Sequence, residues 1–371
     1  MSRDAVILCG EYSGETYALG LVPHLREAGF TVSGMGGQRL ADAGMNVVQD
    51  YRNLSVVGIS EVIAHYTELK AAARKLEDHI RSVRPEVLIC IDFPEFNTRM
   101  ARRVRDAVGK LIYLVPPQVW AWRRYRGRGL SRLFDRIFVL FPFETALFDN
   151  AEFHGHPLTE LVHPEIDRET FLSRYGLSPD RRRVLFLPGS RRREWTGIGP
   201  VMSESAREMI RKWPDLELMI LPSPGMDVEA LSRLVSSMPT PVTVLDHAHK
   251  YAAMTNAHVA VGASGTITLE CGLSGLPMCV LYQLNTLSYL LGMLVVVTRF
   301  ISLPNVVMDE SIMDELVNQD CTSDAVIRYA ERVLDDPKEA DRLRKRLGRL
   351  HERLHCENVY GGITRRILEL I

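Results

Sequence analysis

The stretch VAVGASGT, residues Val259–Thr266, followed by Glu270, decides the fold of this 371-residue chain. Its apolar first half is typical of a buried strand, and a helical pattern begins at Thr266. A helix that starts directly after a strand presents unpaired backbone N–H groups and a positive helix end, which together favour phosphate binding. Gly265 lets an anion approach the backbone, and Ser264 or Thr266 is expected to cap the helix.

Glu270 follows Thr266 by one helical turn and lies on the same face, where its carboxylate can accept hydrogen bonds from a ribose. A diphosphate site followed by a ribose site indicates a nucleotide. An ordinary capped strand–helix junction explains this stretch equally well, so the interpretation depends on the rest of the chain.

Length and composition indicate a soluble globular protein of two domains, with 371 residues, 46% hydrophobic and 25% charged. The net charge of −1 provides no overall field that would attract nucleic acid. The six cysteines are scattered without CxxC spacing, so we expect reduced thiols in a cytosolic protein. We expect no signal peptide, and the longest apolar stretch, Leu287–Val297, is too short to span a bilayer.

Short β-rich apolar runs alternate with longer amphipathic runs, which predicts an α/β fold with parallel sheets and helices on both faces. The expected strands are Ala5–Cys9, Val87–Ile91, Leu111–Val115, Ile137–Leu140, Val184–Leu187, Leu216–Leu221, Val242–Leu245, Val259–Gly262 and Met278–Leu281. The expected helices include Ala18–Ala28, Glu61–Val83, Met202–Lys212, Val228–Val235, Ile267–Leu273, Ala325–Leu334 and Lys338–Leu354. The pattern restarts near Arg182–Val184, so we predict two Rossmann-like domains facing each other across a cleft, with ligands at the strand ends.

In the first half, the best acid–base candidate is Asp92, directly after the strand Val87–Ile91. A carboxylate there is partly desolvated, which raises its pKa toward the range of a general base, and Glu95 is a candidate helper. Alternatively, Asp92 only caps the next helix. The turn Gly10–Glu15 lacks GxGxxG spacing and a P-loop lysine, so it is either a tight turn or one side of an acceptor site.

In the second half, Gly189, Ser190 and Arg191 follow the strand Val184–Leu187, and the Arg191 guanidinium can bind a leaving diphosphate in a bidentate way. Trp120–Arg132 is a basic, aromatic-flanked segment that suggests anionic lipid head groups or a phosphorylated substrate. Nucleic-acid binding and a solvated loop are the alternatives for that segment.

Some patterns exclude chemistry or leave two interpretations. His154 and His156 have no Asp, Glu or Cys at ligand spacing, so we predict no metal site, and without a GxSxG motif we do not expect a serine hydrolase. Leu287–Phe300 is either a core or inter-domain helix or a helix lying in a membrane surface. A leucine stripe near the C-terminus is either a docked helix or a dimer contact. Its members are Leu343, Leu347, Leu350 and Leu354.

The order of the strand-end loops resembles the lipid-A-disaccharide synthase family, inverting glycosyltransferases of the GT-B class, from about residue 5 to residue 356. The motifs that carry the resemblance are Gly10-Glu11-x-Ser13-Gly14, Ile91-Asp92-x-Pro94-x-Phe96-Asn97, Val119-Trp120-Ala121-Trp122-Arg123, Pro142-Phe143-Glu144, Gly155-His156, Leu187-Pro188-Gly189-Ser190-Arg191, Ser264-Gly265-Thr266-x-x-Leu269-Glu270 and Ser302-Leu303-Pro304-Asn305.

The resemblance implies transfer from UDP-2,3-diacylglucosamine to 2,3-diacylglucosamine 1-phosphate, giving a β(1→6) disaccharide and UDP, without metal or cofactor. It implies a peripheral enzyme at the cytoplasmic face of the inner membrane, and a possible homodimer with exchanged C-terminal segments. The implied acceptor-side domain is 1–165 with about 340–371, and the nucleotide-sugar domain is 166–339. The resemblance places Asp92 on the family's candidate base, Arg191 near the diphosphate, Ser264, Thr266 and Glu270 in the nucleotide site, and Asn305, Glu315 and Gln319 in the late cleft and inter-subunit region. Together with the residues singled out from the sequence, the predicted site residues are Asp92 and Glu95 for catalysis; Gly189, Ser190, Arg191, Ser264, Gly265, Thr266, Glu270, Asn305, Glu315 and Gln319 for the nucleotide and diphosphate; and Glu11, Ser13, Gly14, Glu15, Asn97, Trp122 and Arg123 for the acceptor.

The chain also departs from the family pattern. Glu15 replaces the usual Asp, Tyr12 the usual Thr, and Pro116-Pro117-Gln118 the common Ser-Pro-Ser, while Val56–Arg81 is less apolar and basic than the family's membrane-touching region. Two other functions therefore stay open. One is a related GT-B enzyme, such as a UDP-GlcNAc 2-epimerase or a transferase with another acceptor. The other is a catalytically silent nucleotide-binding or membrane-scaffold protein.

Overall fold

The computed structural model describes residues 3–371 apart from 55–61, 123–125, 190–191, 225, 240 and 284–297, and it describes no side chains within 53–67, 121–125 and 190–193. The chain forms two compact units, one of Met1–Pro157 with Leu354–Ile371 and the other of Leu158–Arg353. Helix α16 (Pro337–Leu354) lies in the second unit almost to its end, so the chain returns to the first unit at Leu354 rather than near residue 340.

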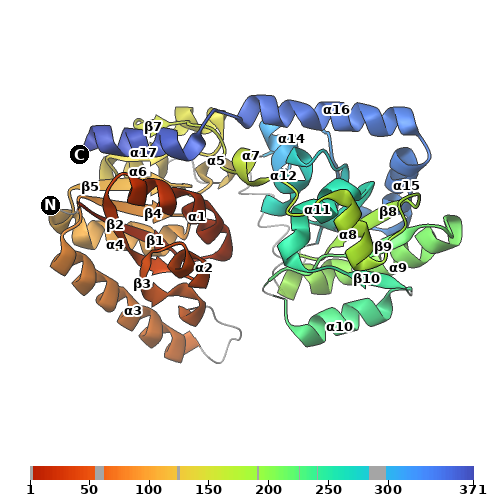
Figure 1. The fold of residues 1–371 in the computed structure, drawn as a ribbon, viewed down its shortest axis with the longest axis horizontal. Helices are drawn as coiled ribbons and strands as arrows, with labels where there is room; N and C mark the ends of the chain where they lie inside the picture. Colours follow the sequence, from red (N-terminus) through yellow and green to blue (C-terminus); the bar gives the residue numbers. More distant parts are fainter. Residues whose placement is uncertain are drawn as a thin grey trace. The chain divides into compact units, whose positions relative to one another are not determined.

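The first unit is built on a parallel sheet in the order β3-β2-β1-β4-β5-β6-β7 (Figure 1). Its strands are β1 (Arg3–Cys9), β2 (Phe30–Gly36), β3 (Asn46–Asp50), β4 (Val87–Ile91), β5 (Lys110–Leu114), β6 (Arg136–Phe138) and β7 (Ala151–Glu152). The central strands β1, β4 and β5 are almost wholly buried, as expected for apolar runs covered on both faces.

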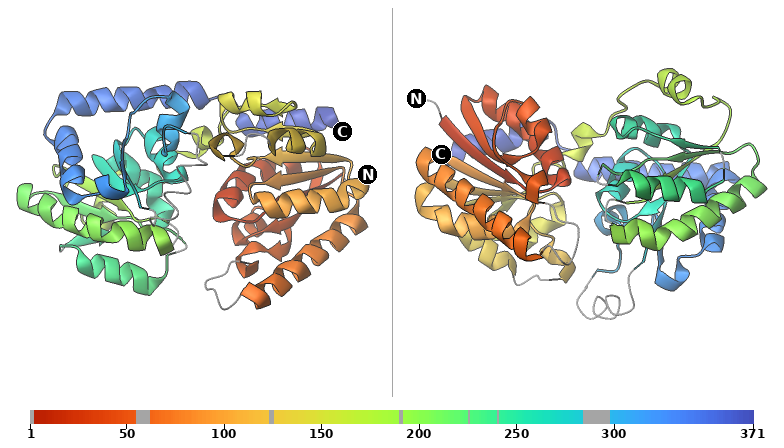
Figure 2. Two further views of the ribbon diagram at one scale, coloured as in Figure 1. Left: turned by 180° about the vertical axis from the view of Figure 1, so that it is seen from behind. Right: turned by 90° about the horizontal axis from the view of Figure 1, so that it is seen from below.

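Helices cover both faces of this sheet, with α3 packed on α4 and α1 packed on α2 and α17 (Figure 2). The α-helices of this unit are α1 (Tyr12–Glu27), α2 (Gln38–Asp42), α3 (Val62–Val83), α4 (Pro94–Val104), α5 (Val119–Trp122), α6 (Arg126–Leu133) and α17 (Val359–Leu370). Its 3-10 turns are η1 (Tyr51–Leu54), η2 (Arg105–Ala107) and η3 (Pro142–Leu147). The C-terminal helix α17 fits against α1 because Tyr360 lies over Gly20, where a Cβ atom would meet its ring at 2.2 Å.

The second unit has a parallel sheet in the order β10-β9-β8-β11-β12-β13. Its strands are β8 (Arg183–Leu187), β9 (Glu217–Ile220), β10 (Val242–Val244), β11 (Val259–Ala263), β12 (Met278–Tyr282) and β13 (Asp314–Val317). Its helices are α7 (Leu158–Leu161), α8 (Arg168–Tyr175), α9 (Arg192–Lys212), α10 (Val228–Ser237), α11 (Lys250–Asn256), α12 (Thr266–Leu273), α14 (Leu303–Met308), α15 (Ser323–Leu334) and α16, with 3-10 turns η4 (His247–His249) and η5 (Asn318–Asp320).

In both sheets the order in which successive strands are added reverses between the first and fourth strands, which pair with each other: β1 with β4, and β8 with β11. This is the strand order of doubly wound nucleotide-binding folds, and it confirms the predicted fold of two Rossmann-like domains. All nine expected strands are present within a few residues of their predicted bounds.

Four strands were missed: β2, β3, β7 and β13. Strand β2 has the sequence FTVSGMG, whose small and polar residues do not form an apolar run, and β7 has two residues. Strands β3 and β13 lie near sheet edges and are only half-buried, so burial imposes little pattern on their sequences.

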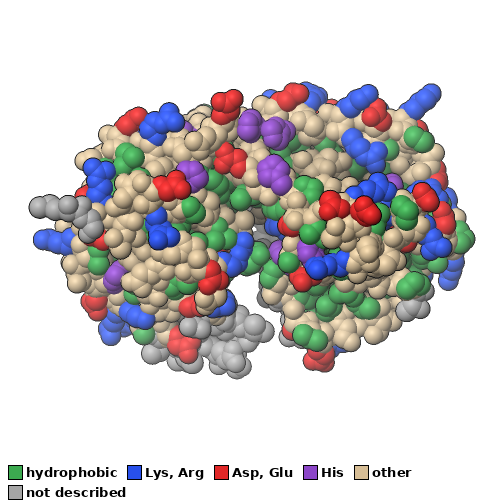
Figure 3. Space-filling model, in the orientation of Figure 1, with side chains coloured by type: hydrophobic (Ala, Val, Ile, Leu, Met, Phe, Trp, Pro, Cys, Tyr) green, Lys and Arg blue, Asp and Glu red, His purple; other side chains and the backbone are tan. Residues whose placement is uncertain are grey.

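The leucine stripe of α16 packs inside the chain, since Leu343, Leu347, Leu350 and Leu354 are buried. Gly272 of α12 makes room for this packing, because a Cβ atom there would meet the Leu350 side chain at 2.7 Å. On the face drawn in Figure 3, Lys or Arg and Asp or Glu side chains are interspersed, in keeping with the net charge of −1. Among the described helices, we find none with the length and apolar character needed to cross a membrane.

Candidate functional site

In the first unit, Asp92 directly follows the buried strand β4 and is half-buried at its carboxyl end. One oxygen of its carboxylate, Oδ1, accepts the backbone N–H of Phe93 at 2.9 Å, and Oδ2 lies 3.4 Å from the donating hydroxyl of Ser13 in α1. Both Asp92 and Phe93 have left-handed backbone conformations, with φ of 51° and 47°. Non-glycine residues rarely adopt this conformation, and such strain is concentrated at functional sites.

Asn97 of α4 holds this strained turn in place. Its Nδ2 donates to the carbonyl oxygens of Asp92 at 2.7 Å, Leu8 at 3.2 Å and Ile91 at 3.3 Å, and the Tyr113 hydroxyl also donates to the Asp92 carbonyl, at 2.9 Å. Asn97 is completely buried, so it cannot contact an acceptor as we had predicted. The predicted acceptor residue is instead a positioning residue for Asp92.

Gly10 is required by the Phe93 ring rather than by a phosphate. A Cβ atom on Gly10 would lie 2.3 Å from Cδ1 of Phe93, far inside van der Waals contact. Gly14, one turn further along α1, has room for a methyl group, because a Cβ atom there would lie 3.5 Å or more from its neighbours. The glycine of the first strand-end turn therefore shapes the backbone around Asp92.

The other predicted acceptor residues of α1 divide into accessible and buried groups. Ser13 is half-buried beside Asp92, whereas Glu15 is 2% exposed and accepts a 2.9 Å hydrogen bond from the Tyr51 hydroxyl. The second oxygen of Glu15, Oε1, is buried and lies where a Cβ atom on Gly37 would approach to 2.5 Å. Glu15 thus belongs to the support beneath the strand ends, while Glu11 is exposed at the start of α1.

Glu95, the predicted helper, is an exposed side chain whose Oε1 pairs with Arg126 of α6 at 2.7 Å. Trp120 is buried and donates its indole N–H to Oε1 of Glu144 at 3.0 Å. Oε2 of Glu144 accepts the backbone N–H groups of residues 140 and 141, so this buried carboxylate anchors the tryptophan segment. The Trp122 side chain and Arg123 lie outside the described residues.

Arg39 was not singled out from the sequence, yet it lies at the same end of the sheet. It follows β2 in helix α2, and its guanidinium lies over the ring of Tyr12, 4.8 Å from the centroid. Its Nη1 also contacts Oγ1 of Thr16 at 3.4 Å. Thr16 follows Ser13 in α1 by about one turn, so Arg39 and Asp92 contact α1 at positions about one turn apart. Arg39 was not predicted as a site residue because β2, the strand that precedes it, was not predicted either.

In the second unit, the start of α12 has the predicted form of an anion site but a different cap. Gly265 is the N-cap residue, has φ of 139°, and makes no side-chain cap hydrogen bond. Ser264 instead donates to the carbonyl of Ile301 at 3.3 Å, so the expected capping by Ser264 or Thr266 is wrong. In the described part of the chain we find no acceptor for the N–H groups of Thr266 and Ile267.

Glu270 lies one turn further along α12 and is buried, with Oε1 accepting from Lys250 Nζ at 2.5 Å and from the Tyr251 hydroxyl at 2.9 Å. Gly189 follows β8 with φ of 92°, and a Cβ atom there would meet Ala263 of β11 at 2.9 Å. The turn after β8 and the turn after β11 therefore lie side by side. Ser190 and Arg191 lie outside the described residues.

Asn305 was predicted as a nucleotide ligand, but it is completely buried with both ends of its amide occupied. Its Nδ2 donates to the Met313 carbonyl and to Glu315 Oε1, both at 2.8 Å, and its Oδ1 accepts the N–H groups of Ile312 and Met313. It holds its loop and has no group left for a direct contact.

Glu315, which accepts a hydrogen bond from Asn305, also accepts the backbone N–H groups of Ile301 at 2.9 Å and Ser302 at 2.8 Å. Because Ser264 bonds to the Ile301 carbonyl, Glu315 supports the loop beside α12 rather than presenting a free carboxylate. Gln319, the third residue predicted in this region, is exposed in η5.

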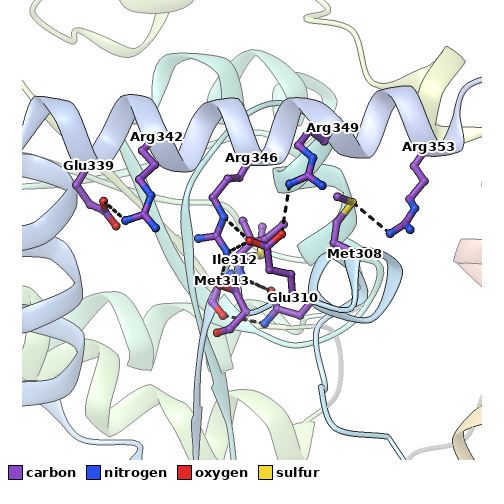
Figure 4. A network of polar contacts seen from close by, with 11 residues as sticks. Met308, Glu310, Ile312, Met313, Glu339, Arg342, Arg346, Arg349 and Arg353 are labelled. Carbon is purple, nitrogen blue, oxygen red and sulfur yellow. Dashed lines mark hydrogen bonds and ion pairs between the residues drawn. The ribbon is translucent and has the colours of Figure 1, made fainter.

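Arginines of α16 hold the same loop from outside (Figure 4). Arg346 and Arg349 pair with Glu310 at 2.6 and 3.4 Å, and the backbone N–H of Glu310 donates to the Asn305 carbonyl at 3.2 Å. Arg346 and Arg349 thus hold the loop that precedes β13, whereas Arg342 and Lys345 pair with acidic residues of their own helix. In the part of the chain described by the structure, no three His, Cys, Asp or Glu side chains gather as a metal site requires. The absence of metal chemistry stays a prediction.

The Phe93–Gly10 contact yields a stability prediction with a matched control. Gly10→Ala should lower the free energy of unfolding by about 1–3 kcal/mol, because the new methyl group must displace the Phe93 ring. Gly14→Ala should be neutral or stabilising by up to about 1 kcal/mol, since it adds a helix-favouring residue without a clash. Urea denaturation of both variants measures this, and equal stability of the two would contradict the packing described.

The raised pKa of Glu144 predicts that the stability of the fold depends on pH. Burial raises the pKa of Glu144 from 4.5 to about 7 in the folded chain. The folded state therefore keeps a proton that the unfolded chain releases, and this stabilisation is lost as pH rises from about 4.5 to about 7. Relative to Glu144→Gln, the wild-type free energy of unfolding should fall by on the order of 3 kcal/mol across that window. Urea titrations at several pH values test this, and parallel curves would refute it.

Comparison with known proteins bears on the whole chain. A family model described as lipid-A-disaccharide synthetase matches residues 5–358. The lipid-A-disaccharide synthase of Geobacter sulfurreducens is 35% identical over 376 residues, which cover 100% of this chain and 97% of that protein. The lipid-A-disaccharide synthase of Nitrosococcus oceani is 30% identical over 370 residues, covering 98% of this chain and 94% of the relative.

Among similar solved structures, the UDP-GlcNAc 2-epimerase of Neisseria meningitidis bound to UDP-GlcNAc has a TM-score of 0.66 at 13% identity, covering 100% of this chain and 99% of that chain. The S. aureus MnaA–UDP co-structure has a TM-score of 0.70 at 13% identity, covering 100% and 98%. The calicheamicin glycosyltransferase CalG4 has a TM-score of 0.62 at 14% identity, covering 100% and 97%. These likenesses show the GT-B fold alone. The full-length match to the family model and to its members shows that the chain belongs to the lipid-A-disaccharide synthase family of glycosyltransferases.

Proposed function

We propose that this protein transfers 2,3-diacylglucosamine from its UDP derivative to the 6-hydroxyl of 2,3-diacylglucosamine 1-phosphate, with inversion at the anomeric carbon. The bond formed joins the acceptor O6 to the donor C1, and the bond broken joins C1 to the diphosphate. The acceptor proton passes to Asp92, and the electron pair of the broken bond leaves with UDP. Lipid A disaccharide synthesis follows from the family, and these substrates and this stereochemistry are the finer proposal.

The observation that carries the nucleotide half is the start of α12, where Gly265 is exposed and no side chain caps the helix. The N–H groups of Thr266 and Ile267 can donate to a diphosphate, and the helix dipole favours the charge that develops on departing UDP. Glu270 follows one turn later and would accept a ribose hydroxyl. We propose that Arg191 adds a bidentate contact to the same diphosphate, so that neither a metal nor a cofactor is required.

Asp92 supports the base assignment through its geometry. The Phe93 N–H and the Ser13 hydroxyl orient its two carboxylate oxygens, and Asn97 and Tyr113 hold its backbone. A carboxylate oriented in this way can take a proton from a hydroxyl as that hydroxyl attacks. Glu95 remains the proposed helper, and Gln319 stays a proposed nucleotide-side residue.

Both proposed substrates carry acyl chains, so we propose that the enzyme meets them at a membrane surface, at the cytoplasmic face of the inner membrane. We also propose that it can form a homodimer with exchanged C-terminal segments. The membrane proposal would be supported by co-sedimentation with vesicles that contain the acylated acceptor, and the dimer proposal by light scattering in solution.

Mass spectrometry of products tests the central proposal. Wild-type protein incubated with both acylated glucosamines should give a disaccharide 1-phosphate and UDP. Asp92→Asn should lower the rate by about 10²–10⁴-fold, the usual contribution of a general base. Asp106→Asn is the control, because Asp106 is an exposed partner of Arg81.

Two results would overturn this function. Conversion of UDP-GlcNAc without any lipid acceptor would identify a 2-epimerase instead, and UDP binding without turnover would identify a silent binding protein. Wild-type activity in Asp92→Asn would remove Asp92 as the base while leaving the overall reaction in place.

Arg39 gives a separate test of the acceptor. In the proposed acceptor the 1-phosphate and the 6-hydroxymethyl group are attached to the two carbons that flank the ring oxygen. Asp92 and Arg39 contact Ser13 and Thr16, which lie about one turn apart on α1, so one acceptor sugar could meet both side chains. Arg39→Met should raise the KM for the phosphorylated acceptor by about 10–100-fold, because a charge-assisted hydrogen bond is lost. The KM for unphosphorylated 2,3-diacylglucosamine should not change.

Arg26→Met is the matched control, since Arg26 is an exposed arginine of α1 that donates to the Ala43 carbonyl. An equal change in KM with both acceptors would show that Arg39 does not bind the phosphate.

A further inference from the structure

The second unit contains a nearly buried ion pair in which the lysine has no role in the proposed chemistry. The Lys250 and Glu270 side chains are 12% and 8% exposed, and Lys250 Nζ lies 2.5 Å from Glu270 Oε1. The Tyr251 hydroxyl donates to the same oxygen at 2.9 Å, and the Lys250 ammonium lies over the Tyr251 ring, 4.4 Å from its centroid. Two adjacent residues of α11 therefore donate to the same carboxylate oxygen of Glu270 in α12.

Stability alone gives a poor account of this pair. Removing two charges from water costs several kcal/mol per ion, and replacing a buried pair by apolar side chains is often neutral or stabilising. A buried pair is more readily explained where a fixed charge has a task, as in the support of a binding site. Here the carboxylate belongs to the helix whose uncapped start is the proposed diphosphate site.

The start of α11, which carries Lys250 and Tyr251, is itself fixed by hydrogen bonds. The Glu165 carboxylate accepts the backbone N–H groups of Tyr251 at 3.2 Å and Ala252 at 3.0 Å, which caps the first turn of α11. Lys250 and Tyr251 thus approach Glu270 from a fixed helix start rather than from a mobile loop.

Both contacts fall on Oε1, and in the described part of the chain the other oxygen, Oε2, has no hydrogen-bond partner. Oε2 is also not among the fully enclosed unpaired atoms of the described side chains. One oxygen is therefore anchored while the other keeps its lone pairs for an incoming donor.

We propose that Lys250 and Tyr251 are positioning residues that set the Glu270 carboxylate to select ribonucleotide donors over 2′-deoxyribonucleotide donors. This inference rests on the proposed function, because it places the ribose beside α12. Anchoring of Oε1 leaves Oε2 to accept the ribose 2′-hydroxyl, and a nucleotide that lacks this hydroxyl leaves that oxygen unpaired. A buried acceptor left unpaired is what makes such a site discriminate strongly.

Calorimetric titration of the full-length protein with UDP and with 2′-deoxy-UDP, without any sugar acceptor, tests this. Wild-type protein should bind UDP about 10–100-fold more tightly, the effect of one hydrogen bond to a charged group. In Lys250→Met the preference should fall below about threefold, with 2′-deoxy-UDP bound as in wild type. Tyr251→Phe, which keeps the aromatic packing, should show a smaller loss of preference and provides a second test if Lys250→Met does not fold.

Lys212→Met is the matched control. Lys212 also pairs with a glutamate, Glu331, and lies over an aromatic ring, that of Trp213, but it is exposed on α9. Its substitution should leave both affinities unchanged.

The outcomes separate the two proposals. A purely structural role of Lys250 would weaken both nucleotides equally, and that result would overturn the inference. An unchanged preference in Lys250→Met and Tyr251→Phe would do the same. Failure of the wild-type protein to bind either nucleotide would instead contradict the proposed function, because the nucleotide would not lie at α12.

Discussion

The parallel pairing of the first and fourth strands in each sheet is the constraint on which the rest of the structure depends. At this pairing the connecting helices leave for opposite faces, so the carboxyl ends of β1 and β4, and of β8 and β11, stay uncovered by a crossover. Every strand end there must turn sharply into a helix. The left-handed Asp92 and Phe93 in one sheet and the positive φ of Gly265 in the other are consequences of that turn.

Sharp turns leave backbone polar groups that need partners, and two buried asparagines supply them. Asn97 donates to three carbonyl oxygens around Asp92, and Asn305 completes both sides of its amide within the loop that precedes β13. The Asn305 amide, with all its groups satisfied, rigidifies its surroundings, whereas an unpaired buried polar group costs about 1–3 kcal/mol. The turns at the carboxyl ends of the strands are therefore held by buried side chains that bond to the backbone.

Buried carboxylates form a second layer of support. Glu144 anchors Trp120, Glu15 accepts from Tyr51, and Glu270 is held by Lys250 and Tyr251. Each is charged or polar at a place where apolar packing would suffice for stability. Their common feature is that each holds a neighbouring element at the carboxyl edge of a sheet, where geometry matters more than burial.

The sequence by itself determined the two-domain parallel fold, the strand-end loops and the family, because apolar runs, glycines and spaced motifs are local signals. It also pointed to Asp92, Gly265 and Glu270. Only the tertiary structure decided that Asn97 and Asn305 hydrogen-bond to backbone groups of their loops, that Glu15 is buried, that Lys250 contacts Glu270 and that Arg39 contacts α1. The physical reason is that hydrogen-bond saturation and exposure depend on partners distant in sequence. Asn97, for example, bonds to Leu8, 89 residues earlier.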